Sequence, residues 1–148
     1  MQQTLLYKDI ERIPEKFFSE DIEVMLEAID NSNDYLKTVW GDWMKARDKA
    51  LLMSIYLLGL RPLEACALRF DDFNMKDGTV LIRGENNKQK KDRILPIPKR
   101  LLKYIMTYLK FPRFMWKSSP YIFPSAENEH ISSERWKMIF REKILKPA

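Results

Sequence analysis

The fold is constrained most by residues 57–70, where two apolar segments meet across a glycine, an arginine and a proline. Gly59 can take the left-handed conformation that ends a helix, and Pro62 suits the first turn of the next one. Proline disfavours helical geometry in the residue before it, so Arg61 is predicted to stand at the start of the second helix. Glu64 is then placed to accept a hydrogen bond from the Arg61 backbone amide.

Two roles are open for the Arg61 side chain. A guanidinium held at a helix start beside free backbone amides suits a phosphate group. Alternatively, the arginine forms an ion pair with a carboxylate and pins two helices together. The apolar residues that follow predict a buried stripe on the new helix, made of Leu63, Cys66, Ala67 and Phe70.

Length and composition predict one globular domain with a sizeable core, because the chain has 148 residues and 45% of them are hydrophobic. A single cysteine excludes an internal disulfide and fits a reducing compartment, and a single histidine gives no metal-site spacing. No apolar run reaches membrane-spanning length, and the first residues lack a signal-peptide pattern. These features predict a cytoplasmic protein with no metal site and no membrane segment.

Charge is distributed unevenly along the chain. Residues 1–60 carry 7 basic and 11 acidic side chains, whereas residues 61–148 carry 19 basic and 10 acidic ones. The basic half favours a polyanionic partner, and nucleic acid is the one expected. The alternative is a solvated basic surface that binds nothing.

The basic residues are densest around a predicted β-hairpin, with strands at 79–83 and 93–97 and a polar loop between them. Seven basic side chains fall between residues 83 and 100, opposed only by Glu85 and Asp92. Such a loop can lie along a phosphate backbone or enter a groove. It can also serve only to blunt a strand edge and keep it soluble.

Apolar residues at helical spacing predict further helices starting near Ser19, Tyr35, Pro98 and Ser132 or Ser133. The helix at 35–58 is expected to be long, and residues 121–124 are expected to form a third short strand. The fold class is therefore mainly α-helical with a small antiparallel β-sheet (α+β). The predicted inner faces are Ile22, Met25, Leu26 and Ile29; Leu36, Val39, Trp40, Trp43, Ala50, Met53 and Leu57; Leu101, Leu102, Ile105, Met106 and Leu109; and Trp136, Ile139, Phe140 and Ile144.

Aromatic residues at 111–116 alternate with Lys110, Arg113 and Lys117. This pattern fits either a nucleic-acid surface or core packing with basic side chains extending to solvent.

Taken in order, these features resemble the catalytic domain of tyrosine recombinases, also called phage integrases. The resemblance runs from about residue 18 to the end, so residues 19–148 are expected to be part of such a domain and residues 1–18 an arm or linker. The segments that carry it are Phe18-Ser19-Glu20-Asp21-Ile22, Gly59-Leu60-Arg61-Pro62-Leu63-Glu64, Leu68-Arg69-Phe70-Asp71-Asp72-Phe73, Lys88-Gln89-Lys90-Lys91-Asp92-Arg93-Ile94-Leu95-Pro96-Ile97 and Ile122-Phe123-Pro124-Ser125.

The resemblance implies a DNA recombinase that cuts and rejoins strands through a 3′-phosphotyrosyl intermediate without a cofactor. Arg61 matches the first catalytic arginine, which binds nonbridging phosphate oxygens. Lys88 matches the hairpin lysine that protonates the leaving 5′-oxygen, with Lys90 or Lys91 as the rival assignment. Glu64 matches an acidic position that supports Arg61. The expected DNA-binding residues are Arg83, Lys90, Lys91 and Arg93.

The sequence departs from the family in its last part. The His-x-x-Arg segment and the nucleophilic tyrosine are absent: His130 precedes the last helix, and none of the six tyrosines follows it. The chain alone is therefore expected not to cleave DNA. It is interpreted as part of a larger integrase; the alternative is a non-catalytic DNA-binding fragment that occupies recombination sites or pairs with an intact integrase. The family acts as tetramers on double-stranded DNA, whereas the isolated chain is expected to be a monomer.

Overall fold

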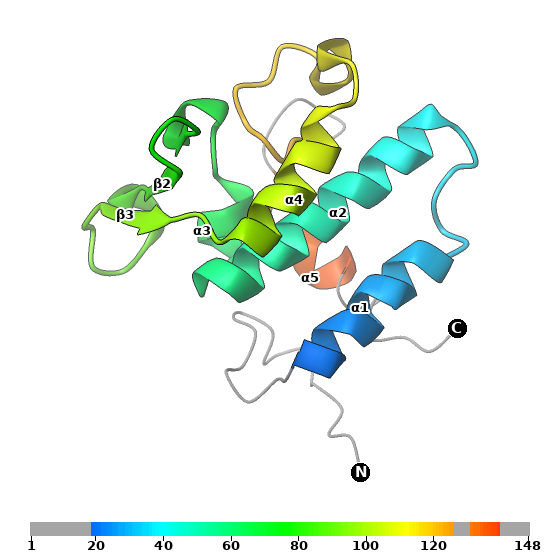
Figure 1. The fold of residues 1–148 in the computed structure, drawn as a ribbon, viewed down its shortest axis with the longest axis horizontal. Coiled ribbons are helices and arrows are strands. Elements are labelled where there is room, and N and C mark those ends of the chain that lie inside the picture. Colours follow the sequence, from blue (N-terminus) through cyan, green and yellow to red (C-terminus); the bar gives the residue numbers. More distant parts are fainter. Residues whose placement is uncertain (1–18, 126–130, 140–148) are drawn as a thin grey trace.

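Helix α2 (Val39–Leu58) is the central element of the fold, and it packs against three other helices, α1, α3 and α4. The computed structural model describes residues 19–125 and 131–139 (Figure 1). Helix α5 packs on α3. The other elements are helices α1 (Ser19–Asn31), α3 (Pro62–Cys66), α4 (Lys99–Leu109) and α5 (Ser133–Ile139), strands β1 (Phe73–Asn74), β2 (Thr79–Ile82) and β3 (Arg93–Pro96), and 3-10 helices η2 (Phe70–Asp72), η3 (Gly84–Asn86) and η4 (Arg113–Trp116).

Helix α2 begins at Val39, not at Tyr35 as the apolar pattern predicted. The Thr38 hydroxyl caps the helix by accepting a hydrogen bond from the Gly41 amide at 3.3 Å. The preceding chain turns back so closely that a side chain on Gly41 would lie 1.6 Å from the carbonyl oxygen of Leu36. Leu36 and Val39 are consequently 66% and 53% exposed, so the first part of the predicted stripe was wrong.

The two tryptophans of α2 have different environments. Trp43 is buried, and its ring lies edge-on to Trp116 with the centroids 5.6 Å apart. Trp40 is 39% exposed and lies beside Phe114, which is 68% exposed. The core interpretation of the tryptophan pair therefore holds for Trp43 only. In the aromatic–basic segment, Trp116 is buried, whereas the ring of Phe114 faces solvent.

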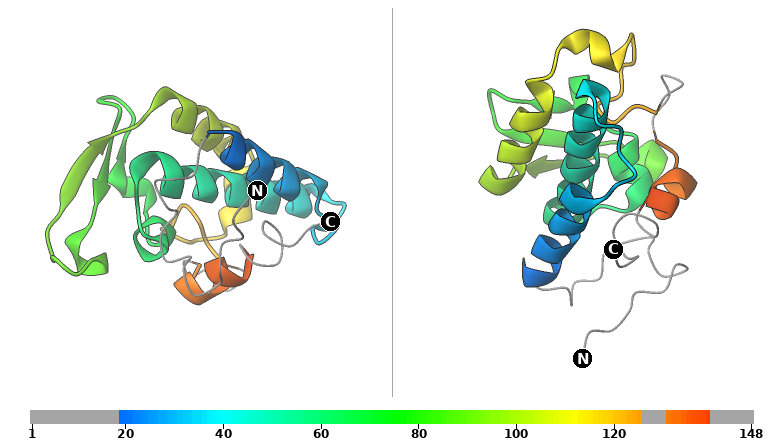
Figure 2. Two further views of the ribbon diagram at one scale, coloured as in Figure 1. Left: turned by 90° about the horizontal axis from the view of Figure 1, so that it is seen from below. Right: turned by 90° about the vertical axis from the view of Figure 1, so that its right-hand side faces the viewer.

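The sheet is antiparallel with strand order β1-β2-β3, which confirms the predicted fold class. Ile82 of β2 lies opposite Arg93 of β3, so the chain between them forms the hairpin loop. Figure 2 shows this hairpin projecting from the helical body. The third strand is β1 and not residues 121–124, because Tyr121 forms only an isolated bridge with Arg69.

Helix α4 buries a slightly different face from the one predicted. Leu101, Ile105 and Tyr108 are buried, but Met106 is 45% exposed. The Tyr108 hydroxyl donates to the carbonyl of Ile122 at 2.7 Å, which satisfies its polar end inside the core. Before α5, the Ser132 hydroxyl accepts from the backbone amide of residue 135 and caps the helix.

Several predictions fall outside the described residues, namely those for residues 1–18, His130, Phe140 and Ile144. No helix in the described ranges is both long and apolar enough to cross a membrane.

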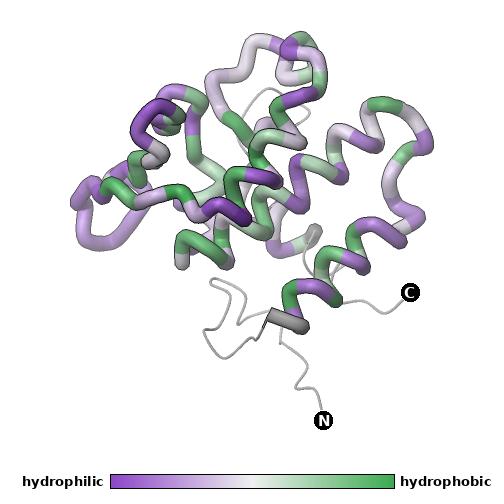
Figure 3. Tube along the Cα trace, viewed as in Figure 1, coloured by the Kyte–Doolittle hydropathy of each residue, from purple (hydrophilic) through white to green (hydrophobic). Residues whose placement is uncertain are grey.

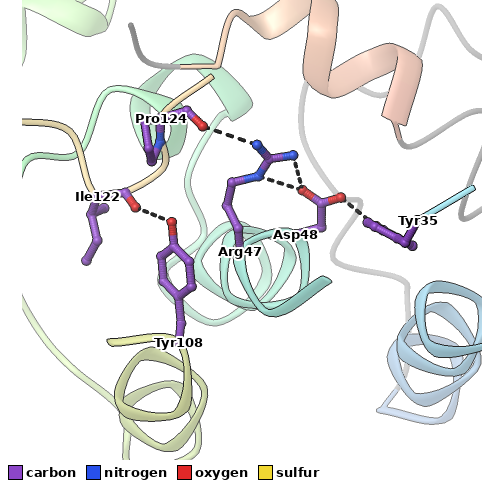
Figure 4. A network of polar contacts seen from close by, with 6 residues as sticks. All are labelled: Tyr35, Arg47, Asp48, Tyr108, Ile122 and Pro124. Carbon is purple, nitrogen blue, oxygen red and sulfur yellow. Dashed lines mark hydrogen bonds and ion pairs between the residues drawn. The ribbon is translucent and has the colours of Figure 1, made fainter. Parts of the chain in front are cut away.

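A charged pair that was not predicted from the sequence lies in the interior (Figure 4). Arg47 and Asp48 of α2 are 4% and 0% exposed, and they form an ion pair in which Arg47 Nη2 lies 3.0 Å from Asp48 Oδ1. Arg47 also donates to the carbonyl of Pro124 at 3.2 Å. The Tyr35 hydroxyl donates to the second oxygen of Asp48. Burial and the negative charge of Asp48 raise the pKa of the Tyr35 phenol, so that it stays protonated and keeps donating.

Candidate functional site

The segment between α2 and α3 folds as its sequence predicts. Gly59 ends α2 in the left-handed conformation, with φ 64° and ψ 36°. Arg61 is extended, with φ −74° and ψ 150°, and Pro62 is the first residue of α3. The Arg61 amide donates to Glu64 Oε1 at 3.0 Å, which is the backbone hydrogen bond that the sequence predicts. The backbone thus fixes the position from which the Arg61 side chain leaves the helix start.

The Arg61 guanidinium itself is exposed, and no hydrogen bond or ion pair holds it within the described residues. The alternative of a structural ion pair between Arg61 and a carboxylate, whether Glu64 or another, is therefore not found among the described residues. Glu64 Oε2 instead accepts from Arg93 Nη2 at 2.9 Å. The predicted buried stripe is interrupted because α3 ends at Cys66 and Leu63 is 42% exposed.

Glu64 is almost wholly buried, with 4% of its side chain exposed, yet it links two separate elements. One oxygen holds the backbone at the start of α3, and the other holds an arginine at the start of β3. A buried carboxylate needs such partners because burial without them is costly. The carboxylate therefore attaches the second strand of the hairpin to the helix that carries Arg61.

A second carboxylate, Asp72, repeats this arrangement at the other strand. Asp72 Oδ2 accepts from the Arg69 amide at 2.9 Å. Asp72 Oδ1 accepts a hydrogen bond from Arg83 Nε at 2.8 Å, and it also lies 2.8 Å from Arg83 Nη2 in an ion pair. Only 1% of the Asp72 side chain is exposed. The hydrogen bond and the charge of Asp72 raise the pKa of Arg83 above its already high value, so this pair stays charged.

Arg83 and Arg93 therefore flank the hairpin loop, and each is held by a buried carboxylate. The loop closes at its base through the Gly84 amide, which donates to Asp92 Oδ1 at 2.7 Å. A side chain on Gly84 would lie 2.5 Å from the backbone nitrogen of Lys91, so the two arms of the loop leave no room for one.

The three lysines of the loop are all exposed: Lys88, Lys90 and Lys91. Figure 3 shows that the loop is hydrophilic along its length. Lys90 has a positive φ of 55°, and its ammonium donates to the Glu85 carbonyl at 3.3 Å. The side chains of Lys88 and Lys91 are exposed, and neither forms a hydrogen bond or ion pair with another described residue.

The structure thus brings together Arg61, Glu64 and Arg93 directly, and it places Lys88, Lys90 and Lys91 on a loop attached to that cluster. Sequence reasoning missed Asp72. Its signal was the spacing to Arg69, which equals the spacing of Glu64 to Arg61. In the described ranges, no cluster of three or more histidine, cysteine, aspartate or glutamate side chains could hold a metal ion.

A model of the phage integrase family matches residues 18–146. The chain belongs to this family. Among curated proteins, tyrosine recombinase XerA of Pyrococcus furiosus is 30% identical over 129 residues, covering 87% of this chain and 39% of the relative. Tyrosine recombinase XerD of Vibrio cholerae is 25% identical over 126 residues, covering 83% and 38%. The chain therefore spans about two fifths of the length of these tyrosine recombinases.

Solved structures agree on the fold. The crystal structure of XerA recombinase matches with a TM-score of 0.65 and 19% identity, covering 88% of this chain and 41% of that one. XerH site-specific recombinase bound to its difH substrate, in a pre-cleavage complex, matches with a TM-score of 0.60 and 20% identity, covering 92% and 38%.

Proposed function

We propose that this chain is the DNA-binding, N-terminal part of the catalytic domain of a site-specific recombinase. In the complete protein it would supply Arg61 and Lys88 for cutting and rejoining DNA strands. The observation that carries the proposal is Glu64, which joins the helix start at Arg61 to the hairpin strand at Arg93. Membership of the phage integrase family supports the same conclusion.

Arg61 is the proposed phosphate ligand. Its guanidinium is exposed and has no partner among the residues that the structure describes, while its backbone is fixed by Pro62 and Glu64. A planar guanidinium can donate two parallel hydrogen bonds to phosphate oxygens, which a lysine cannot do. Loss of one such donor from a site that stabilises a charged transition state costs about 3–4 kcal/mol.

Lys88 is the proposed general acid for the leaving 5′-oxygen. Of its two rivals, Lys90 is engaged by the Glu85 carbonyl, which makes it the weaker candidate. Lys91 directly precedes Asp92 at the base of the loop. Lys90, Lys91, Arg83 and Arg93 are proposed to contact the DNA backbone beside the reacting phosphate.

The chain on its own is proposed to bind DNA without cleaving it. The buried hydroxyls of Tyr35 and Tyr108 are bonded to Asp48 and to the Ile122 carbonyl, so neither is available as a nucleophile. We propose that the free chain is a monomer in the cytoplasm, where its DNA partner lies. Sedimentation of the free chain tests the monomer, and a dimer at micromolar concentration would contradict it.

The proposal is tested first by the salt dependence of duplex-DNA binding, measured by fluorescence anisotropy. The logarithm of affinity should fall linearly with the logarithm of salt concentration, by about 0.9 for each phosphate neutralised. Arg61→Gln should lower this slope by about one phosphate while leaving the urea unfolding midpoint unchanged. Lys103→Gln removes the same charge from the exposed face of α4 and should leave the slope unaltered. Equal effects of the two variants would instead favour non-specific binding.

Catalysis is tested in the full-length protein with a nicked DNA substrate, by trapping the covalent protein–DNA adduct. Arg61→Gln and Lys88→Gln should each slow cleavage by about a hundredfold or more. A substrate whose leaving oxygen is replaced by sulfur needs little protonation, so it should rescue Lys88→Gln but not Arg61→Gln. Full cleavage by both variants would leave the non-catalytic DNA-binding alternative.

A further inference from the structure

The hairpin loop leaves the body of the protein between two arginines that are each tied to a buried carboxylate. Arg83 lies directly before the loop and Arg93 directly after it. Asp72 holds the first at 2.8 Å and Glu64 holds the second at 2.9 Å. Both carboxylates also accept a backbone amide from the residue three positions earlier. The loop is therefore attached at both ends to the segment that carries Arg61.

We propose that Asp72 is a positioning residue, which acts through Arg83 to set where the lysine loop lies relative to Arg61. This inference rests on the proposed function, and it assigns a role to a residue that touches neither DNA nor the reacting atoms. It also assigns Arg83 chiefly to anchoring the loop. The guanidinium edge of Arg83 that faces Asp72 is already used, with Nε in a hydrogen bond and Nη2 in an ion pair.

The chemistry of Asp72 explains why an amide cannot replace it. Both of its carboxylate oxygens accept hydrogen bonds, one from the Arg69 amide and one from Arg83. An asparagine has one accepting oxygen and one donating nitrogen, so one of the two contacts would become donor against donor. The substitution should therefore release either the turn at Arg69 or the arginine that anchors the loop.

In the DNA-binding test, electrostatics and loop positioning predict opposite changes in affinity. Asp72→Asn removes a negative charge from a protein that binds a polyanion, so electrostatics alone predicts tighter binding. Positioning predicts the opposite, a fall in duplex-DNA affinity of about tenfold at moderate salt, because loop lysines that are free to move must be ordered on binding. Asp71→Asn is the matched control, since Asp71 is an exposed neighbour of equal charge on η2, and it should bind DNA as tightly as the parent chain or more tightly.

Amide hydrogen exchange provides a readout that does not depend on DNA. Asp72→Asn should accelerate exchange at Gly84 and Asn87 by tenfold or more, while the amides of Leu101 and Ile105 in α4 keep their parental rates. Asn87 is a suitable reporter because its amide donates to the Gly84 carbonyl at 3.1 Å within the loop. If the parent chain bound no DNA, the proposed function would fail, yet the exchange measurement would still decide the positioning role.

Variants of Arg83 decide the matter if Asp72→Asn does not fold, because 34% of the Arg83 side chain is exposed and its replacement leaves no cavity. Arg83→Gln should accelerate loop exchange, whereas Lys91→Gln, with the same loss of charge, should not. Arg83→Lys, which keeps the charge and one hydrogen bond, should restore much of the protection. The inference is overturned if Asp72→Asn behaves as Asp71→Asn in DNA binding, or if Arg83→Gln leaves loop exchange at the parental rate.

Discussion

Arg47 and Asp48 are neighbours in sequence and partners in the core, which is an unusual place for two charges. The pair is tolerated because its groups have further partners: Tyr35 donates to Asp48, and Arg47 donates to the Pro124 carbonyl. The Arg47 guanidinium also lies 5.6 Å from the centre of the Trp43 ring. At the scale of single residues, this network joins the loop before α2 to the segment after η4, across the centre of the molecule.

Removing one member of this network should be far more damaging than removing a surface charge. Asp48→Ala leaves Arg47 buried without its carboxylate, and loss of one partner of a buried pair costs about 3–5 kcal/mol. Urea unfolding followed by tryptophan fluorescence measures the change. Asp30→Ala breaks the surface ion pair between Asp30 and Lys49, whose side chains are 52% and 27% exposed respectively. This loss should lower the free energy of unfolding by at most about 1 kcal/mol. Equal losses in the two variants would contradict the structural role of the buried pair.

Residue-scale predictions succeeded where the chemistry was local. The positions of Gly59, Arg61, Pro62 and Glu64 follow from backbone preferences and a hydrogen bond that spans three residues. The partner of Glu64 in β3 could not be predicted, because it lies 29 residues away in sequence. The burial of Arg47 could not be predicted either, because its carbonyl partner, Pro124, lies 77 residues away in sequence.

At the scale of elements, the start of α2 shows how a tight turn overrides an apolar periodicity. The pattern from Leu36 to Trp43 suits a helix, but Thr38 caps the helix and the carbonyl of Leu36 approaches Gly41. The sequence did contain the relevant signals, a threonine three residues before a glycine, but neither signal is decisive alone. Helix existence was therefore predictable, whereas the exact first turn was not.

Gly41→Ala tests this arrangement of the first turn. Replacing glycine by alanine inside a helix normally stabilises it by up to about 1 kcal/mol. Here the added methyl group would lie 1.6 Å from the Leu36 carbonyl oxygen, so the turn must open. A loss of about 1–3 kcal/mol in the free energy of unfolding is expected, because overpacking has this cost. A more stable variant in urea unfolding would contradict the geometry of the turn.

On the scale of the whole molecule, helices form the body and the basic hairpin projects from one end (Figure 2). The helical class and the hairpin follow from periodicity and from the turn residues around the loop. The identity of the third strand did not follow, since β1 has only two residues and pairs with β2 through a short turn. Helix α1, which is acidic, lies away from the hairpin that carries the basic residues between 83 and 93.

The start of α3 and the hairpin loop are proposed to form one DNA-binding surface. Titration of the isotope-labelled chain with a short DNA duplex, followed by amide chemical shifts, tests it most directly. We expect the shifts to change at Arg61 to Glu64 and at residues 84–93, and those of α1 and of the exposed face of α4 to stay unchanged. Shifts confined to α1 and α4, or changes in the loop without any at Arg61, would contradict it.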